Sequence, residues 1–365
     1  MTTLDLAIKL IEFESTFSNP KETKKVLNFV EDYVTTKCKD KLLVDTYSHN
    51  NLDTLIISTK SLKNPKLAFY AHLDVVNASK KCFKPYVEDD TLYGRGSGDM
   101  KGPAASLINA FIDLVNQDPT LDICLLLPTD EESGGQNCIK ALLENYDFRT
   151  DCVIMPDSGS GLDTIITNQK GIIFTEVTFN GQSSHGSRPW EGISAIELLM
   201  DYYQKLVANF PEARQEYFST VNPSIISGGK SFNSVADKAQ MTLDIRTANS
   251  SDHAAVLELL KSLDTDRITH TNKFIDPAFE LPESHKYMQL AQKITQEIIG
   301  KKVDFKKEHG GSDGRFFQSF NIPCIVFGVE KKHTHGENEY ASITEILQLE
   351  EFTKEFTKQF FSKAN

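Results

Sequence analysis

The chain has 365 residues, and its 51 acidic side chains outnumber its 39 basic side chains, which gives a formal net charge of −12. Proteins that bind nucleic acids usually carry a positive surplus that neutralises phosphates. The charge therefore argues against a nucleic-acid partner. The length predicts about two domains, and a hydrophobic content of 39% is sufficient for a buried core.

Membrane and export signals are not evident in the sequence. No apolar run approaches the roughly 20 residues that a membrane-spanning helix needs, and the first residues form no basic, cleavable leader. We therefore expect a cytoplasmic protein with no membrane partner. The six cysteines form no Cys-x-x-Cys pair, and several lie in apolar runs, so we expect buried, reduced thiols.

Helical and strand patterns alternate along most of the chain. Apolar residues at helical spacing predict two opening helices within residues 4–37, separated by the turn Ser18-Asn19-Pro20. Short apolar runs predict buried strands at 52–58, 67–73, 123–127, 152–155 and 322–327. Further helices are predicted at 103–115, 138–144 and 343–361. This alternation is typical of an α/β protein with a mixed, mostly parallel sheet flanked by helices.

Residues 172–276 show a different order of elements. The predicted elements are a strand at 173–179, a helix at 193–207, strands at 221–227 and 239–245, a helix at 253–263 and a strand at 267–274. This β-α-β-β-α-β order is the split βαβ, or ferredoxin-like, arrangement. We therefore expect an inserted α+β domain of about 100 residues between two parts of a catalytic domain, 1–171 and 277–365.

Short polar clusters follow the predicted strands or lie in a glycine-rich segment. Their candidate functional residues are His72, Asp74, Asp99, Glu131, Glu132, Asp157 and His335. Ligands of open α/β sheets bind beyond the carboxyl ends of the strands, so these residues could converge on one site. Histidines with several carboxylates are typical of a pair of divalent ions about 3.5–4 Å apart, with Zn²⁺ the most plausible metal.

Each of these clusters also has an ordinary interpretation when taken alone. His72 and Asp74 could be a surface pair, and Glu131 and Glu132 could form a solvated acidic turn. Asp99 could cap the helix that begins near residue 101. The combination of the clusters favours the metal site.

Six segments together resemble the motifs of one protein family. They are residues 72–74, 94–102, 130–135, 184–189, 310–316 and 335–339. Their motifs are similar to those of the co-catalytic zinc family of acetylornithine deacetylase, succinyl-diaminopimelate desuccinylase, aminoacylase, carboxypeptidase G and the carnosine dipeptidases. The segments occur in order and span most of the chain.

The resemblance implies a role for each residue of the metal site. One Zn²⁺ would be held by His72 and Asp157 and the other by Glu132 and His335, with Asp99 as the bridge. Co²⁺ and Mn²⁺ are the expected substitutes for Zn²⁺. The spacing His-x-x-Asn-Glu in the family selects His335 over His333 as the ligand.

Two further residues would act beside the metals. Asp74 would orient the ring of His72 through a hydrogen bond. Glu131 would be the general base for a zinc-activated hydroxide that attacks an amide carbonyl, and it would then protonate the leaving amine.

The inserted domain would act as a lid and in dimerisation. In the family, the residue equivalent to His185 reaches across a homodimer and stabilises the oxyanion in the partner's active site. Arg246 and Asn233 would contact the substrate, and Gly311 and Ser312 would bind its carboxylate. The alternatives are a polar turn at His185, surface positions at Asn233 and Arg246, and a flexible turn at 310–315.

The resemblance implies an enzyme that hydrolyses the amide bond of a small N-acyl amino acid, similar to acetylornithine deacetylase or succinyl-diaminopimelate desuccinylase. Asp157 stands where such deacylases usually have glutamate and favours the alternative, a dipeptidase or aminopeptidase of the same family. Residues 312–316 are closer to the desuccinylase, whereas Lys170 stands where that enzyme has an arginine-rich stretch. A catalytically inactive binding protein is disfavoured because competent residue types occupy every metal position and the base.

Overall fold

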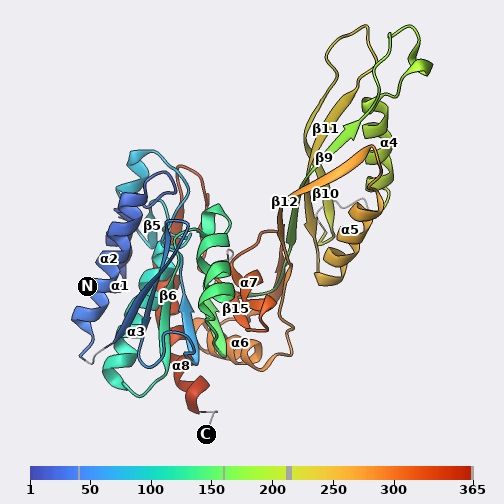
Figure 1. Cartoon of the computed structure of the whole chain (residues 1–365). Coiled ribbons are helices and arrows are strands. Elements are labelled where there is room, and N and C mark those ends of the chain that lie inside the picture. The colour runs from blue at the N-terminus through green and yellow to red at the C-terminus, as the bar shows by residue number, and fades with distance from the viewer. Residues whose placement is uncertain (40–41, 159–160, 211–215, 363–365) are drawn as a thin grey trace. The chain divides into compact units, whose positions relative to one another are not determined.

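The computed structural model describes residues 1–39, 42–158, 161–210 and 216–362 (Figure 1). The chain divides into two compact units. Unit 1 comprises Met1–Thr167, Leu281–Lys306 and Ser312–Asn365, and unit 2 comprises Asn168–Glu280 and Lys307–Gly311. The sequence predicts domain boundaries at 171/172 and 276/277 and places residues 307–311 in the catalytic domain. In the structure, residues 307–311 belong to unit 2.

The large sheet of unit 1 has the strand order β1–β2–β6–β3–β7–β15–β8, and β14 also pairs with β8. The bounds of these strands are β1 Leu43–His49, β2 Leu52–Ser58, β3 Leu67–Tyr70, β6 Ile123–Leu127, β7 Cys152–Met155, β8 Thr164–Gln169, β14 Asp304–Glu308 and β15 Cys324–Phe327. The central strands β3, β6 and β7 are buried along their whole length. Their continuous apolar runs reflect this burial on both faces.

The direction of the strands changes across this sheet. The central strands β6, β3, β7 and β15 are parallel, whereas β1, β2 and β8 pair antiparallel with their neighbours. The sheet is therefore mixed, as predicted, with its parallel part confined to the centre. Strand β1 was not predicted because it lies at the edge and is only partly buried; Asn50 and Asn51, both with positive φ, form the tight turn that joins it to β2.

Helices cover the large sheet and complete the core of unit 1. They are α1 Thr3–Ile11, α2 Pro20–Lys37, α3 Lys101–Gln117, α6 Lys286–Ile299, α7 Gly314–Ser319 and α8 Ile343–Ser362. Helix α3 packs against β3 and β6, and α6 and α7 pack against β15. The two opening helices, α3 and α8 confirm the predictions at 4–37, 103–115 and 343–361. All six cysteines are free and buried.

Several elements of unit 1 differ from the predictions. The segment predicted as a helix at 138–144 forms two π-helical turns, Gln136–Lys140 and Leu142–Tyr146. Helices α6 and α7 were not predicted. A small antiparallel sheet, also not predicted, has the order β16–β17–β5–β4. Its strands are β4 Tyr86–Glu88, β5 Thr91–Tyr93, β16 Lys331–Lys332 and β17 Tyr340–Ser342.

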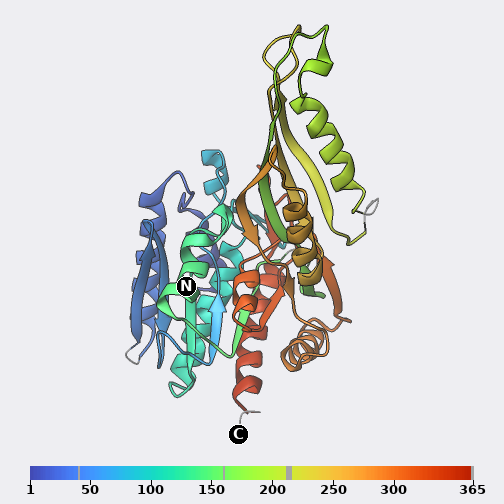
Figure 2. The ribbon, with the colours of Figure 1, turned by 45° about the vertical axis from the view of Figure 1, so that its right-hand side comes forward.

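Unit 2 has the predicted β-α-β-β-α-β order. Its main elements are β9 Gly171–Asn180, α4 Ala195–Val207, β10 Thr220–Gly228, β11 Lys238–Thr247, α5 Ser250–Ser262 and β12 Ile268–Asp276. The antiparallel sheet has the order β10–β11–β9–β12, and α4 and α5 pack against one face of it (Figure 2). The short strand β13 (Phe279–Glu280) pairs with residues 168 and 169 of β8.

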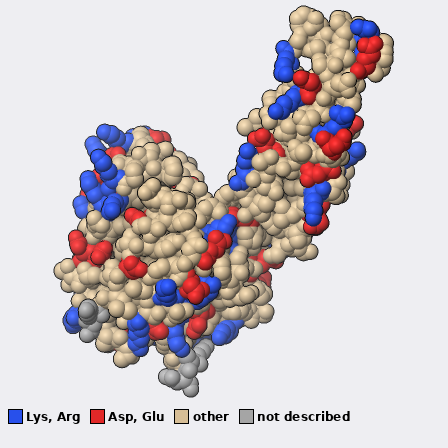
Figure 3. All heavy atoms as spheres, viewed as in Figure 1, with Lys and Arg blue, Asp and Glu red and all other residues tan. Residues whose placement is uncertain are grey.

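The surface of unit 2 carries charges of both signs. Figure 3 shows Lys and Arg side chains beside Asp and Glu side chains on the face that it draws. Exposed ion pairs such as Arg188–Glu191 and Lys230–Asp237 belong to this pattern. Within the part of the chain that the structure describes, no helix is both long enough and apolar enough to span a membrane.

Candidate metal centre

Three neighbouring strands end beside the same group of polar side chains. His72 and Asp74 follow β3, Glu131 and Glu132 follow β6, and Asp157 follows β7. Strands β6, β3 and β7 are parallel neighbours, so their carboxyl ends lie at one edge of the sheet. This is the edge at which open α/β sheets bind their ligands.

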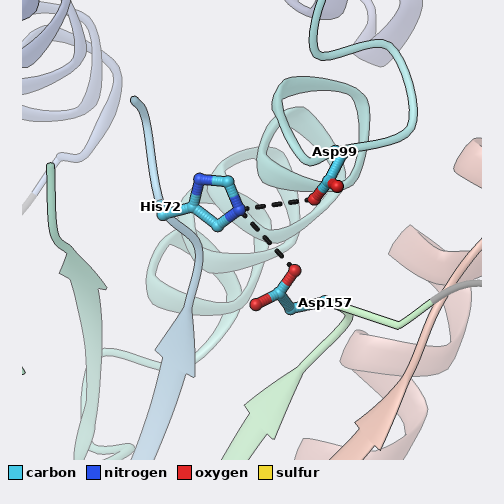
Figure 4. A group of neighbouring side chains, drawn as sticks. All are labelled: His72, Asp99 and Asp157. Atoms are coloured by element: carbon cyan, nitrogen blue, oxygen red, sulfur yellow. Dashed lines mark ion pairs between the residues drawn. The ribbon is translucent and has the colours of Figure 1, made fainter. Parts of the chain in front are cut away.

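The first group of possible metal ligands consists of His72, Asp99 and Asp157. Asp99 lies in the loop before α3, and its carboxylate points toward the same ring nitrogen as that of Asp157 (Figure 4). His72 Nε2 is 3.5 Å from Asp99 Oδ1 and 3.6 Å from Asp157 Oδ1. These separations are too long for hydrogen bonds, so the three groups converge without bonding one another.

The other nitrogen of the His72 ring fixes its tautomer. Nδ1 lies 3.0 Å from the backbone carbonyl oxygen of Asp74. A carbonyl oxygen only accepts hydrogen bonds, so Nδ1 carries a proton, and Nε2 is the nitrogen whose lone pair can face the carboxylates or a metal ion when the ring is neutral. The Asp74 carboxylate lies farther from the ring, at 3.5 Å, and its Oδ2 accepts a hydrogen bond of 3.0 Å from the backbone N–H of Glu132.

The second group of possible ligands consists of Asp99, Glu132 and His335. His335 Nε2 is 3.5 Å from Asp99 Oδ2 and 3.1 Å from Glu132 Oε2. The two oxygens of Asp99 thus face different histidines, one in each group. A carboxylate in this position can bind two ions at once.

Burial and unpaired polar atoms indicate that the two groups fit metal ions. Among the described residues, His72 Nε2, Asp157 Oδ2 and Glu132 Oε1 are buried and have no hydrogen-bond partner. Ligand atoms about 2.0–2.1 Å from a tetrahedral ion lie about 3.3 Å from one another. The separations of 3.1 to 3.6 Å are close to this value, and a divalent cation in each group would offset the repulsion among the three carboxylates.

The negative charge of the site raises the pKa values of both histidines. Burial alone would lower the pKa of His72, but Asp157, Asp74 and Asp99 raise it well above its ordinary value. The carboxylates of Asp99 and Glu132, which face its ring, raise the pKa of His335 to about 10. The site therefore stabilises positive charge at the positions where the ligand nitrogens lie.

Glu131 belongs to neither group of ligands. Its Oε2 is 4.0 Å from His72 Nε2, and its side chain is 14% exposed. Burial, followed by the Asp157 carboxylate, raises the pKa of Glu131 well above its ordinary value. A carboxyl group with this pKa can hold a proton close to the ligand atoms.

Lys331 contributes a positive charge that the sequence analysis did not predict. Its Nζ lies 3.6 Å from Asp99 Oδ1, and its side chain is 7% exposed. Burial alone would raise the pKa of Asp99, but Lys331, His335 and His72 hold it well below its ordinary value. No local pattern predicts this contact, because two consecutive lysines, Lys331 and Lys332, are typical of an exposed surface.

The residues predicted to contact substrate lie in other environments. His185 is exposed in unit 2, and its Nδ1 accepts the backbone N–H of Ser187 at 3.2 Å, which leaves Nε2 protonated in the neutral ring. Asn233 is also exposed, and it accepts a hydrogen bond from Ser231. Arg246 is partly buried and forms a two-point ion pair with Asp244.

The glycine-rich segment at 310–315 divides between the two units. Gly311 is exposed in unit 2, whereas Ser312 is fully buried in unit 1. The Ser312 hydroxyl accepts the backbone N–H of Gly314 at 3.4 Å, and Tyr70 donates a hydrogen bond of 2.8 Å to the buried Asp313. Asp313, which the sequence analysis did not single out, thus joins this segment to β3.

Comparisons with known proteins concern the family and the fold of this chain. The model of the peptidase family M20/M25/M40 matches residues 68–359. The succinyl-diaminopimelate desuccinylase of Ehrlichia ruminantium (strain Gardel) is 28% identical to this chain over 321 residues, which cover 82% of this chain and 83% of the relative.

Two solved structures have a similar fold. Aminopeptidase PepT from Bacillus cereus ATCC 10987 aligns with a TM-score of 0.78 and 18% identity, and the alignment covers 98% of this chain and 97% of that one. The YXEP protein of Bacillus subtilis, described as a dinuclear metal binding peptidase, aligns with a TM-score of 0.70 and 15% identity over 99% and 98% of the two chains.

Proposed function

Since the chain belongs to the peptidase family M20/M25/M40 and is a metal-dependent hydrolase of amide bonds, we propose that it cleaves the amide bond of a small N-acyl amino acid. The observation that carries the proposal is the position of Asp99, whose two oxygens face His72 and His335. One shared carboxylate between two groups of ligands is suited to a pair of ions. Such pairs serve hydrolytic reactions.

The proposed metals are two Zn²⁺ ions, for which Co²⁺ or Mn²⁺ would substitute. His72, Asp99 and Asp157 would hold one ion, and Asp99, Glu132 and His335 would hold the other. When bound, the two ions would polarise the substrate carbonyl and lower the pKa of a water molecule. Imidazole and carboxylate ligands suit Zn²⁺.

The chain's own residues would position the ligands and move the proton. Asp74 orients the ring of His72 through its backbone carbonyl and fixes the acidic turn through the N–H of Glu132. Glu131 would act as the general base, because it lies beside the ligands without belonging to either group. It would take a proton from the attacking water and then deliver it to the leaving amine.

Residues of unit 2, together with Ser312 of unit 1, are proposed to act on the substrate. The exposed ring of His185 presents a protonated Nε2 that could donate to the developing oxyanion of a partner subunit. Arg246, Asn233, Gly311 and Ser312 would bind the substrate, and Arg246 would exchange its pairing with Asp244 for the substrate carboxylate. The proposal for Ser312 requires a movement of its segment, since its side chain is buried.

We propose a homodimer formed through unit 2. Strand β10 lies at the edge of its sheet, and Ile225 and Ile226 on this strand are 63% and 57% exposed. An exposed apolar edge strand is a template for pairing with a second chain. Met200 and Phe232 add further exposed apolar surface in the same unit.

The relatives support two substrate classes. The desuccinylase of Ehrlichia ruminantium acts on an N-acyl amino acid, as its name states, and is the more similar in sequence. Aminopeptidase PepT, which is similar in fold, and Asp157 in place of glutamate favour a dipeptidase or aminopeptidase as the second candidate. A panel of N-acetyl amino acids, N-succinyl-diaminopimelate and dipeptides, assayed with Zn²⁺ or Co²⁺, distinguishes the two. Turnover of dipeptides alone would refute the deacylase.

The role of Glu131 has its own test. Glu131→Gln should lower kcat by about 10²- to 10⁴-fold, which is the usual contribution of a general base, and should leave two bound metal ions per chain. The exposed Glu12 gives a control, and Glu12→Gln should leave kcat unchanged. Full activity of Glu131→Gln would refute the assignment.

The shared active site can be tested by mixing two inactive proteins. A His185→Ala chain and a Glu131→Ala chain should regain part of the activity when their subunits exchange. No recovery after demonstrated exchange would count against a contribution of His185 to the partner's site.

A further inference from the structure

A buried ion pair lies beside the second group of ligands. Arg95 follows β5 and Glu339 immediately precedes β17, and the antiparallel register pairs Tyr93 with Tyr340. The pairing of these strands therefore brings two residues that are far apart in the sequence into contact. Both residues are 2% exposed, and Arg95 Nη1 donates a hydrogen bond to Glu339 Oε2.

Each member of the pair also holds the backbone of a ligand-bearing loop. Glu339 Oε1 accepts hydrogen bonds from the backbone N–H groups of Gly98, at 3.3 Å, and Asp99, at 3.2 Å. Arg95 Nη2 donates to the backbone carbonyl of Gly336 at 3.1 Å. The pair thus connects the backbone of Asp99 to the residue that follows His335.

The two groups of ligands depend on this connection to different degrees. In the first group, His72 is fully buried and its ring is held by the Asp74 carbonyl. In the second group, the side chain of His335 is 53% exposed and its backbone has a positive φ of 65°. The loop that carries His335 needs an anchor, whereas His72 follows directly after β3, which is held in the centre of the sheet.

We propose that Arg95 and Glu339 are positioning residues that set the distance between Asp99 and His335 and thereby determine the affinity of the second metal ion. The proposal rests on the two-metal centre proposed above. Groups that orient metal ligands from outside typically change metal affinity by about 10- to 100-fold when they are altered. The pair should act mainly on the ion held by Asp99, Glu132 and His335.

The test is calorimetric titration of Zn²⁺ into the metal-free full chain. The wild type should bind two ions per chain. Glu339→Gln keeps the size of the side chain but removes the charge that pairs with Arg95, and it should weaken the second binding constant by about 10- to 100-fold while the first stays within threefold of the wild type. Co²⁺ absorption spectra should show the same change at the second equivalent only.

Two further variants make the experiment specific. Arg95→Lys keeps the positive charge, but an ammonium group lacks the two separate N–H groups with which the guanidinium reaches both Glu339 and the Gly336 carbonyl. This variant should weaken the binding of the second ion, but less than Glu339→Gln does. Glu337 lies in the same segment, but it is exposed and bonds to Lys81 and Ser79 at the surface. Glu337→Gln should leave both binding constants unchanged.

The outcomes separate this proposal from the metal centre itself. If the wild type does not bind two ions, the proposed centre is wrong. If the wild type binds two ions and Glu339→Gln binds both as tightly, the positioning role is refuted. It is also refuted if Glu339→Gln keeps a native fold by circular dichroism but loses affinity for both ions equally. If Glu339→Gln does not fold, Arg95→Lys decides the matter. An unchanged binding constant for the second ion in Arg95→Lys refutes the proposal, and weaker binding of the second ion alone supports it.

Discussion

Two glycines with the same backbone conformation provide a test of how the acidic turn is packed. Gly135 (φ 67°) closes the segment that carries Glu131 and Glu132, and Gly300 (φ 65°) follows helix α6. A Cβ atom added at Gly135 would lie 2.1 Å from Asp313 Oδ1 and 2.8 Å from Phe316 Cε2. A Cβ atom at Gly300 would meet nothing within 4 Å.

The two alanine variants should therefore differ by the steric cost alone. The left-handed conformation costs an alanine about 1–2 kcal/mol at either position. Overpacking adds about 1–3 kcal/mol at Gly135 only, because both contacting atoms belong to buried side chains. We expect the free energy of unfolding to fall by about 2–5 kcal/mol in Gly135→Ala and by about 1–2 kcal/mol in Gly300→Ala.

Thermal unfolding in the presence of a chelator measures this difference without a contribution from metal binding. A loss of 1 kcal/mol lowers Tm by about 2–4 °C in a domain of this size class, so Gly135→Ala should melt clearly below Gly300→Ala. Gly135→Ala should also bind metal more weakly, because its neighbours Glu131 and Glu132 must shift. Equal Tm values for the two variants would refute the argument that Asp313 and Phe316 leave no room for a side chain at Gly135.

Further predictions concern pH and metal removal. Burial raises the pKa of Asp313 to about 7 despite the nearby Arg315. Between about pH 4 and pH 7 the folded chain therefore keeps a proton on Asp313 that the unfolded chain has lost. This proton binding stabilises the folded chain, and the stabilisation is lost as the pH rises toward about 7. Between pH 5 and pH 7, the free energy of unfolding of Asp313→Asn, measured with urea, should therefore rise by about 2–3 kcal/mol relative to that of the wild type. A difference in unfolding free energy between the two proteins that does not depend on pH would contradict this. Removal of metal should lower Tm, because an ion at 1,000 times its Kd stabilises the folded chain by about 4 kcal/mol. Zn²⁺ should restore the Tm of the wild type but not that of His72→Ala, and a Tm insensitive to chelator would argue against the metal centre.

The sequence predicted the centre of the large sheet well because its strands are buried on both faces. Continuous apolar runs identify β3, β6 and β7, and polar residues directly after parallel strands must lie at one edge of the sheet. The same reasoning does not detect β1, which is partly exposed and lies at the edge. Helix α6 has buried residues at helical spacing, such as Met288, Ala291 and Ile294, so hydrophobic periodicity does mark this helix in the sequence.

Contacts between distant residues could not be predicted from local patterns. Arg95 and Glu339 are 244 residues apart, and only the pairing of β5 with β17 brings them together. The same applies to Lys331, which reaches Asp99 from β16. Hydrophobic periodicity identifies which face of a strand is buried, but it carries no information about which strands of a small exposed sheet become neighbours.

The local structure of the acidic turn explains how adjacent glutamates come to have different surroundings. Residues Glu131–Ser133 form a 3₁₀ turn, in which successive side chains are separated by about 120° because each turn has three residues. The Asp74 carboxylate holds the N–H of Glu132, and Arg315 donates to the Gly134 carbonyl at 3.0 Å. With both ends of the turn fixed, the Glu132 carboxylate lies 3.1 Å from His335 Nε2, whereas the Glu131 carboxylate lies 4.0 Å from His72 Nε2. The turn therefore places the two carboxylates beside different histidines, which is the arrangement that the proposed ligand Glu132 and the proposed base Glu131 require.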